Sequence, residues 1–140
     1  MNKEKVYIAG KFELKDEVVR CFRNLEEGNY EVAYDWTKHK NIKPYPENQA
    51  TANEYSENEI QGIINSDIFI YLSAETGHTL HMEFGAALVL CAKSNKPHTV
   101  YAVGNFKDNS PWLFNKRVKR RSNLEEVESE LLQKSKLFRH

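Results

Sequence analysis

The segment from Ser66 to Leu90 most constrains what this chain can fold into. It contains the run IFIYL at residues 68–72, whose β-branched and aromatic residues are typical of a strand buried on both faces of a parallel sheet. Small and polar residues follow from Ser73 to Thr79, and a helix pattern rich in Ala, Leu, Met and Val extends from Leu80 to about Ser94. The order strand, loop, helix predicts one unit of an α/β sheet.

The rest of the chain alternates in the same way. Strands are expected at Val6–Ala9, Tyr30–Tyr34 and Thr99–Val103, with a short last strand from Val118, and helices at Leu14–Glu27, from Thr51 to about Asn65, and from Ser122 onward. This alternation predicts a Rossmann-like (flavodoxin-like) α/β fold, in which a doubly wound parallel sheet of four or five strands carries helices on both faces. A length of 140 residues suits one domain, so residues 1–140 are expected to form a single one.

Two helix starts are predicted from capping boxes, in which a Ser or Thr side chain and a Glu three residues later satisfy free backbone amides. The boxes are Thr51-Ala52-Asn53-Glu54, and Ser122 with Glu125. On the first of these helices, three isoleucines are expected to face inward: Ile60, Ile63 and Ile64.

Composition excludes several functional classes. Twenty basic and 20 acidic residues cancel, so there is no electrostatic case for binding a nucleic acid polymer or a membrane surface. No apolar run reaches the roughly 18 residues of a membrane helix, and the amino terminus passes directly into a strand, so no signal peptide is expected. Cys21 and Cys91 fall on apolar helix faces and are expected to be buried thiols in a cytoplasmic protein. No metal-ligand spacing is present, and neither a metal nor an organic cofactor is expected.

The carboxyl ends of parallel strands meet at one edge of a sheet, where such folds bind ligands. That edge is expected to collect carboxylates, an aromatic plane and small residues: Gly10, Phe12, Asp35, Trp36 and the 73–79 loop with Glu83. Neither a dinucleotide fingerprint, a P-loop nor a GxSxG motif occurs. A carboxylate pair beside an aromatic ring suits attack on the anomeric carbon of a sugar whose base stacks on the ring.

Each of these residues also has a structural interpretation. A Glu in the first turn of a helix, as predicted for Glu83, often serves only as a favourable partner for the helix dipole. Asp35 could cap a turn, and Trp36 could be an aromatic residue packed in its loop.

The order and spacing of five segments resemble the nucleoside 2-deoxyribosyltransferase-like family across nearly the whole chain: VYIAGKF, YDWT, NEIQGIINSDIFIYL, HMEFGAAL and SPWLFNKRV. The resemblance implies that Glu83 is the nucleophile that takes the sugar at its anomeric carbon, and that Tyr7 orients it. Glu59 falls on a family acidic position that is Asp in the best-known transferases.

The loop before Glu83 departs from the well-known transferases, which carry an Asp six positions before the nucleophile, where this chain has Gly77. Relatives without that Asp include nucleotide N-glycosidases, which pass the sugar to water. The residues expected to bind substrate are Gly10, Phe12, Asp35, Trp36, Gly77 and His81.

The resemblance therefore implies cleavage or transfer of the N-glycosidic bond of a small-molecule nucleoside or nucleotide. It also implies a homo-oligomer, with Trp112 and Phe114 as candidate contacts. Two alternatives stay open. The segment SDIFIYLS followed by a helical Glu also resembles Toll/interleukin-receptor-like NAD glycohydrolases. Gly77 in place of the family Asp favours a non-catalytic nucleotide-binding module.

Overall fold

A computed structural model describes residues 2–138 of the chain, and these residues form one five-stranded parallel sheet. The strands are β1 (Lys5–Ala9), β2 (Glu31–Val32), β3 (Ile68–Leu72), β4 (Thr99–Val103) and β5 (Val118–Arg121), in the spatial order β2-β1-β3-β4-β5. This is the flavodoxin-like order of doubly wound folds, so the predicted fold class is confirmed.

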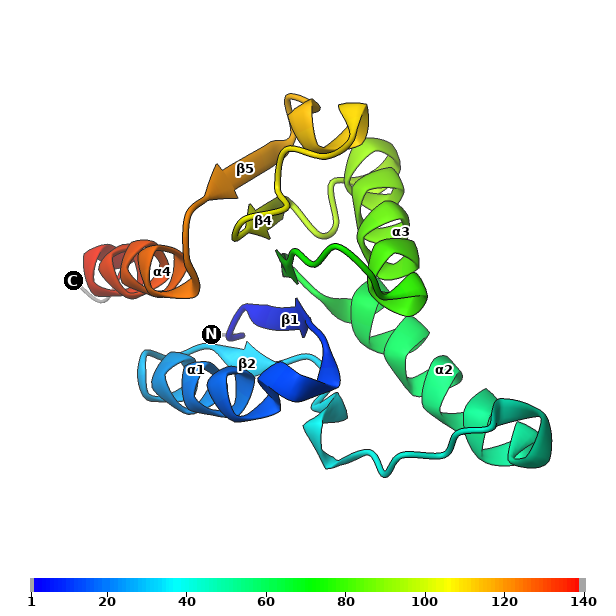
Figure 1. Cartoon of the computed structure of the whole chain (residues 1–140). Helices are drawn as coiled ribbons and strands as arrows, with labels where there is room; N and C mark the ends of the chain where they lie inside the picture. The colour runs from blue at the N-terminus through cyan, green and yellow to red at the C-terminus, as the bar shows by residue number, and fades with distance from the viewer. Residues whose placement is uncertain (1, 139–140) are drawn as a thin grey trace.

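The helices cover both faces of the sheet (Figure 1). Helices α1 (Lys15–Glu27) and α4 (Leu124–Phe138) pack together on one face, and α2 (Gln49–Asn65) and α3 (His78–Ser94) pack together on the other. Four short 3-10 turns complete the secondary structure of residues 2–138: η1 (Phe12–Leu14), η2 (Trp36–Lys38), η3 (Tyr45–Glu47) and η4 (Pro111–Phe114).

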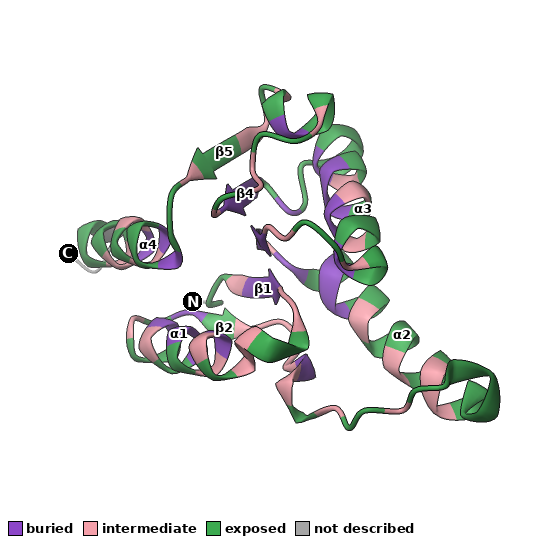
Figure 2. Ribbon diagram, in the orientation of Figure 1, coloured by how far each residue is buried: buried purple, intermediate pink, exposed green. Residues whose placement is uncertain are grey.

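The central strands form the core. Every residue of β3 and β4 is buried, and Figure 2 shows these strands as the buried centre of the molecule. The position of β3 between β1 and β4, under helices on both faces, explains why its sequence is apolar without alternation. Edge strand β5 carries exposed Lys119 and Arg120, charges that disfavour further strand pairing.

The crossover connections diverge between β1 and β3. From β1 the chain passes through α1 to β2 on one side, and from β3 it passes through α3 to β4 on the other. Such a switch point leaves a crevice outside the carboxyl ends of the two strands, where doubly wound folds bind ligands. Residues at the ends of β1 and β3, and at the start of α3, therefore lie where the sequence predicted the site.

Both predicted capping boxes are wrong. Helix α2 begins at Gln49, before Thr51, because the side-chain amide of Asn48 bonds the carbonyls of Ile42 and Pro44 and shapes the turn ahead of the helix. Helix α4 begins at Leu124, and Asn123 rather than the preceding serine accepts the backbone N–H of Glu126, at 2.9 Å.

Two of the three isoleucines predicted to face inward from α2 do not. Ile63 is buried, whereas Ile60 and Ile64 are 48% and 43% exposed. The reason is that α2 contacts the sheet along the line of Gly62 and Ile63, which turns the other two side chains outward.

Two further expectations can be compared with the structure. Cys21 and Cys91 are free, buried thiols, as predicted. Within residues 2–138, no helix has the length and apolar character needed to cross a membrane.

Candidate active site

Tyr7 and Glu83 form the centre of the candidate site. Tyr7 lies in the middle of β1, is fully buried, and stacks on Phe69 of β3 with ring centroids 5.5 Å apart. Its hydroxyl donates a hydrogen bond to Oε2 of Glu83. Because α3 begins at His78, earlier than predicted, Glu83 lies in the second turn, where it reaches over β1. Two residues far apart in the sequence are thus joined at the switch point.

Burial dominates the electrostatics of this pair. It raises the pKa of Glu83 to about 8; the hydrogen bond from Tyr7 acts in the opposite direction, and the charge of Glu59 adds to the increase. Burial and the neighbouring Glu83 raise the pKa of Tyr7 far above its usual range, so its hydroxyl remains a donor. The carboxyl group of Glu83 is thereby held at one oxygen by a donor that does not ionise.

Glu59 of α2 is the second carboxyl group of the site. Burial raises its pKa to about 7, and its charge raises the pKa of both Glu83 and Tyr7. Two carboxyl groups that are held partly protonated near neutral pH, on two helices that meet over β1, are a common mark of a functional site.

The close approach of α2 brings Glu59 to the site. A Cβ added to Gly62 would lie 2.7 Å from Cβ of Tyr34 and 3.1 Å from Cε2 of Tyr7, so the helix backbone packs directly on these residues. Glu59 lies nearly one turn before Gly62 and shares its face. Sequence reasoning did not assign Gly62; its only signal was a glycine inside a predicted helix.

A second contact, also not predicted, holds the 34–39 segment against α2. The hydroxyl of Tyr34 lies 2.6 Å from Nε2 of His39, and the His39 ring stacks on Tyr55 of α2 with centroids 3.7 Å apart. Burial lowers the pKa of His39, so a neutral imidazole is favoured there. The 34–39 segment is therefore held against α2 by aromatic rings.

Asp35 and Trp36 have structural roles, a turn cap and a packed aromatic residue. The Asp35 carboxylate accepts the backbone N–H of Thr37 at 2.9 Å and the Thr37 hydroxyl, and so caps η2. Trp36 is 6% exposed and its indole N–H donates to the carbonyl of Ile8 at 2.5 Å. The prediction that Trp36 offers a face to a base is therefore corrected: its ring belongs to the core.

The loop after β1 carries an exposed aromatic ring and a closely packed glycine, both predicted to bind substrate. Phe12 is 44% exposed, and the ammonium group of Lys15 lies 4.6 Å from its ring centroid. A Cβ on Gly10 would lie 3.1 Å from Cδ1 of Leu72, so the glycine permits close approach of the β1 and β3 ends. Lys11 donates to the hydroxyl of Thr76 at 2.7 Å and joins the two loops that border the crevice.

Gly77 and His81 shape the start of α3. Gly77 has φ +118°, a backbone conformation that a residue with a Cβ adopts only with strain, and its carbonyl accepts the N–H of His81. The His81 ring contacts the carbonyl of Ala74 and the edge of Tyr71. Because residues two apart on a helix do not share a face, the structure does not bring His81 together with Glu83.

This arrangement provides a partly buried carboxyl group held by a tyrosine, and a second partly buried carboxyl group on the neighbouring helix α2. In the described part of the chain, no group of three or more His, Cys, Asp or Glu side chains is placed to hold a metal ion. A carboxylate nucleophile and a proton donor on neighbouring elements suit the substitution of a group at a sugar carbon.

Comparison with known proteins shows the fold. No protein-family model and no curated protein matches the sequence. Among solved structures, the chain is similar to the CMP N-glycosidase BcmB of Clostridium botulinum, with a TM-score of 0.55 and 20% identity over 96% of this chain and 99% of that chain. The two chains therefore share a fold over nearly the full length of each.

Proposed function

We propose that this protein cleaves the N-glycosidic bond of a nucleoside or nucleotide, with Glu83 as nucleophile and Tyr7 as the residue that positions it. The observation that carries the proposal is the partly buried Glu83 carboxyl group, bonded to the Tyr7 hydroxyl at the β1–β3 switch point. The fold shared with a CMP N-glycosidase supports the same reaction class.

The proposed reaction has two steps. Ionised Glu83 attacks the anomeric carbon from the face opposite the base, and the carbon–nitrogen bond breaks with its electron pair moving to the base. Glu59, which its raised pKa keeps partly protonated near pH 7, gives its proton to the departing base. A glycosyl ester on Glu83 results. Water then attacks the sugar carbon while Glu59 takes a proton from it, which releases the sugar and restores both carboxyl groups.

Transfer differs from hydrolysis only in the second step, in which a second base replaces water. A base-exchange assay with two different nucleobases separates the two activities. A transferase forms the new nucleoside, whereas a glycosidase releases free sugar at the same rate in both mixtures.

Phe12 is the residue proposed to stack on the base, since its ring is exposed beside the crevice. Gly10 and Gly77 are proposed to contribute backbone groups, because they lie in the loops that follow β1 and β3. We assign no substrate contact to Asp35 or Trp36, whose polar groups are engaged within the protein.

Release of free base, followed by chromatography, tests the proposal. The panel contains nucleosides, nucleoside monophosphates and NAD, and the variants are Glu83→Gln and, as a matched control, Glu57→Gln at an exposed position on α2. We expect release by the wild type and by the control, with a loss of at least about 1,000-fold in Glu83→Gln.

Other outcomes separate the alternatives. Release of nicotinamide from NAD alone identifies the NAD glycohydrolase. Binding of nucleotides without any release identifies a non-catalytic module. Release that is undiminished in Glu83→Gln contradicts Glu83 as nucleophile.

We also propose that the chain forms a homo-oligomer through the outer sides of α2 and α3. Large apolar side chains are exposed there: Ile60 and Ile64 on α2, and Met82 at 70% and Val89 at 53% on α3. A helix that is apolar on nearly every side, as α3 is after its first turn, is usually buried on more than one side. A second copy of the chain would provide that cover.

A further inference from the structure

A separate pocket lies on the side of α3 that faces away from Glu83. It has a volume of about 470 Å³ and is bounded by the end of β3, the 74–75 segment, α3 and the 106–113 segment before β5. Glu83, Glu59 and Tyr7 are not among its lining residues. Its volume lies in the range of small-molecule sites, roughly 300–1,000 Å³. The candidate active site does not account for this pocket.

The pocket walls are aromatic. Tyr71 and Phe84 stack on each other with ring centroids 4.9 Å apart, and Phe106 and Trp112 complete the walls. A Cβ added to Gly85 would meet Cζ3 of Trp112 at 3.8 Å, so the indole lies over a helix position that has no side chain. The glycine leaves space beneath the indole, and flat apolar walls of this kind suit a planar ring.

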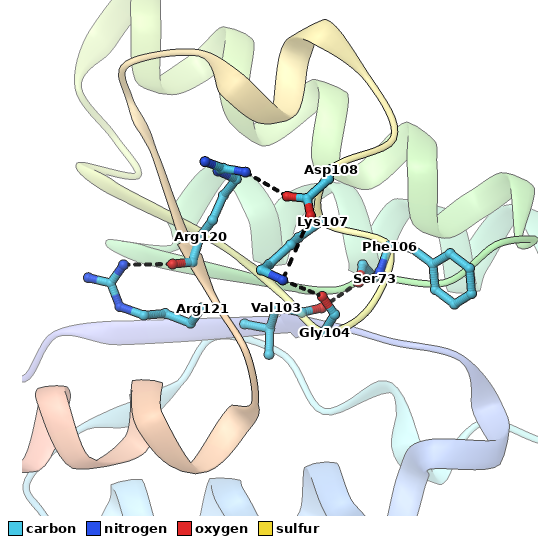
Figure 3. Close-up of polar contacts among 8 residues, drawn as sticks. All are labelled: Ser73, Val103, Gly104, Phe106, Lys107, Asp108, Arg120 and Arg121. Carbon is cyan, nitrogen blue, oxygen red and sulfur yellow. Dashed lines mark hydrogen bonds and ion pairs between the residues drawn. The ribbon is translucent and has the colours of Figure 1, made fainter.

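Hydrogen bonds hold the wall that contains Phe106 in place (Figure 3). The Ser73 hydroxyl donates to the carbonyl of Val103 at 2.5 Å and accepts the backbone N–H of Phe106 at 3.1 Å. Asp108 accepts from Arg120 of β5 at 2.5 Å. Figure 3 shows the Phe106 ring pointing away from this polar cluster. The wall is therefore formed before any ligand arrives.

Polar groups are few and lie on two sides of the pocket. Glu75 and His81 come from the segments on one side, and Asn109 and Ser110 come from the other. The Ser110 oxygen accepts the backbone N–H of Trp112, which leaves the hydroxyl hydrogen as a donor. A carboxylate accepts hydrogen bonds from an amino group, and an amide both donates and accepts. This set matches the edge of a ring that carries an amino group beside an acceptor nitrogen.

We infer that this pocket is a second site, separate from Glu83, for a planar nitrogen heterocycle of nucleobase size with an exocyclic amino group. Adenine and cytosine have this chemistry, whereas hypoxanthine and uracil carry a carbonyl oxygen in place of the amino group. The inference does not depend on the proposed reaction, because free bases contain no glycosidic bond.

Binding of the four free bases tests the inference, measured by calorimetry and by tryptophan emission. We expect adenine and cytosine to bind at least tenfold more tightly than hypoxanthine and uracil, and to change the emission of exposed Trp112. Trp112→Phe should remove the emission change and keep the calorimetric signal, since Trp36 is buried in the core.

Two substitutions at one position locate the site. Gly85→Leu places a side chain in the pocket and should weaken binding at least tenfold. Gly85→Ala, the matched control, adds only a Cβ in ordinary contact and should change affinity less than threefold. Asn109→Ala on the exposed loop is a second variant that needs no helix substitution, and it should weaken adenine binding at least fivefold.

Glu83→Gln distinguishes the two sites, because this substitution is expected to leave the affinity of the pocket for free bases unchanged. Three results would overturn the inference: no binding of adenine or cytosine to the wild type, binding that Gly85→Leu and Asn109→Ala leave unchanged, or equal binding of all four bases. Failure of base release from nucleosides would count against the proposed reaction and leave this site unaffected.

Discussion

At the scale of single residues, the raised pKa of Glu83 links the site to stability. The unfolded chain releases this proton near pH 4.5, whereas the folded protein holds it up to about pH 8. The free energy of unfolding is therefore highest, as far as Glu83 determines it, below pH 4.5. It decreases as the pH rises from 4.5 to about 8, because burying an ionised Glu83 on folding is unfavourable. An ionisable group that destabilises its own fold is a common feature of functional sites.

Replacing Glu83 with Gln should make the protein more stable at alkaline pH. We expect the free energy of unfolding at pH 8, measured with urea, to exceed that of the wild type by about 4 kcal/mol, since each pKa unit between 4.5 and about 8 corresponds to about 1.4 kcal/mol and the folded group is half ionised at pH 8. At pH 4 the two proteins should differ little. Lower stability of Glu83→Gln at pH 8 would contradict the burial of an ionisable carboxyl group.

Glu59 as proton donor predicts a dependence on the leaving base. Glu59→Gln should lose about 100-fold or more in kcat with adenosine-type substrates, which require a proton on the base. It should lose less than about tenfold with 7-methylguanosine at pH 7, because that base departs without a proton. Equal losses on both substrates would show that Glu59 instead holds sugar hydroxyl groups.

The same roles predict a bell-shaped dependence of kcat/KM on pH. Glu83 gains its active ionised form as the pH rises through about 8, and Glu59 loses its active protonated form as the pH rises through about 7. The maximum is expected between these values. In Glu59→Gln the decrease at high pH should disappear, and a decrease that persists would assign it to another group.

At the scale of elements, the sequence predicts the central parts of the fold well. The bounds of β3 and β4 agree with prediction. Each is a continuous apolar run bounded by polar or turn-forming residues, and such a run is stable as a strand buried at the centre of a doubly wound sheet. The start of α2 and the orientation of Ile60 and Ile64 were not predictable locally. Both features depend on how closely Gly62 lets α2 approach β1, and this distance is set by tertiary packing.

The candidate site shows the same division. Glu83 and Tyr7 were identified through resemblance to a family, and the structure joins them by a hydrogen bond. The role of Trp36 was not predictable, because a position near the end of a strand leaves the orientation of the ring undetermined. The ring can face the ligand-binding edge or the core. His39 carried no local signal, since its partners Tyr34 and Tyr55 meet it only in the folded chain.

Two helix glycines provide a matched test of the α2 contact. Gly62→Ala should destabilise the protein by about 1–3 kcal/mol, because its Cβ meets Tyr34 and Tyr7, and it should lower activity by moving Tyr7. Gly85→Ala in α3 should be neutral or stabilising by about 0.5–1 kcal/mol. Thermal unfolding of the two variants decides this, and equal stability of both would contradict the close contact of α2.

At the scale of the whole molecule, the apolar outer sides of α2 and α3 predict self-association. The mass measured by size exclusion with light scattering should be a multiple of 16.3 kDa. Ile64→Glu and Val89→Glu should convert the protein to a monomer. Leu137→Glu, at a 76% exposed apolar residue on α4, is the matched control and should have no effect. A monomeric wild type would contradict the proposal.

The central claim is that Glu83 forms a bond to the sugar, and trapping that bond is the most direct test. A nucleoside with fluorine at the sugar 2-position slows the second step, so that peptide mass spectrometry can detect the glycosyl ester. In the wild type we expect one sugar on the peptide that contains Glu83, together with release of the base. In Glu83→Gln we expect neither the labelled peptide nor base release. Base release with the sugar on another residue, or on none, would contradict the account.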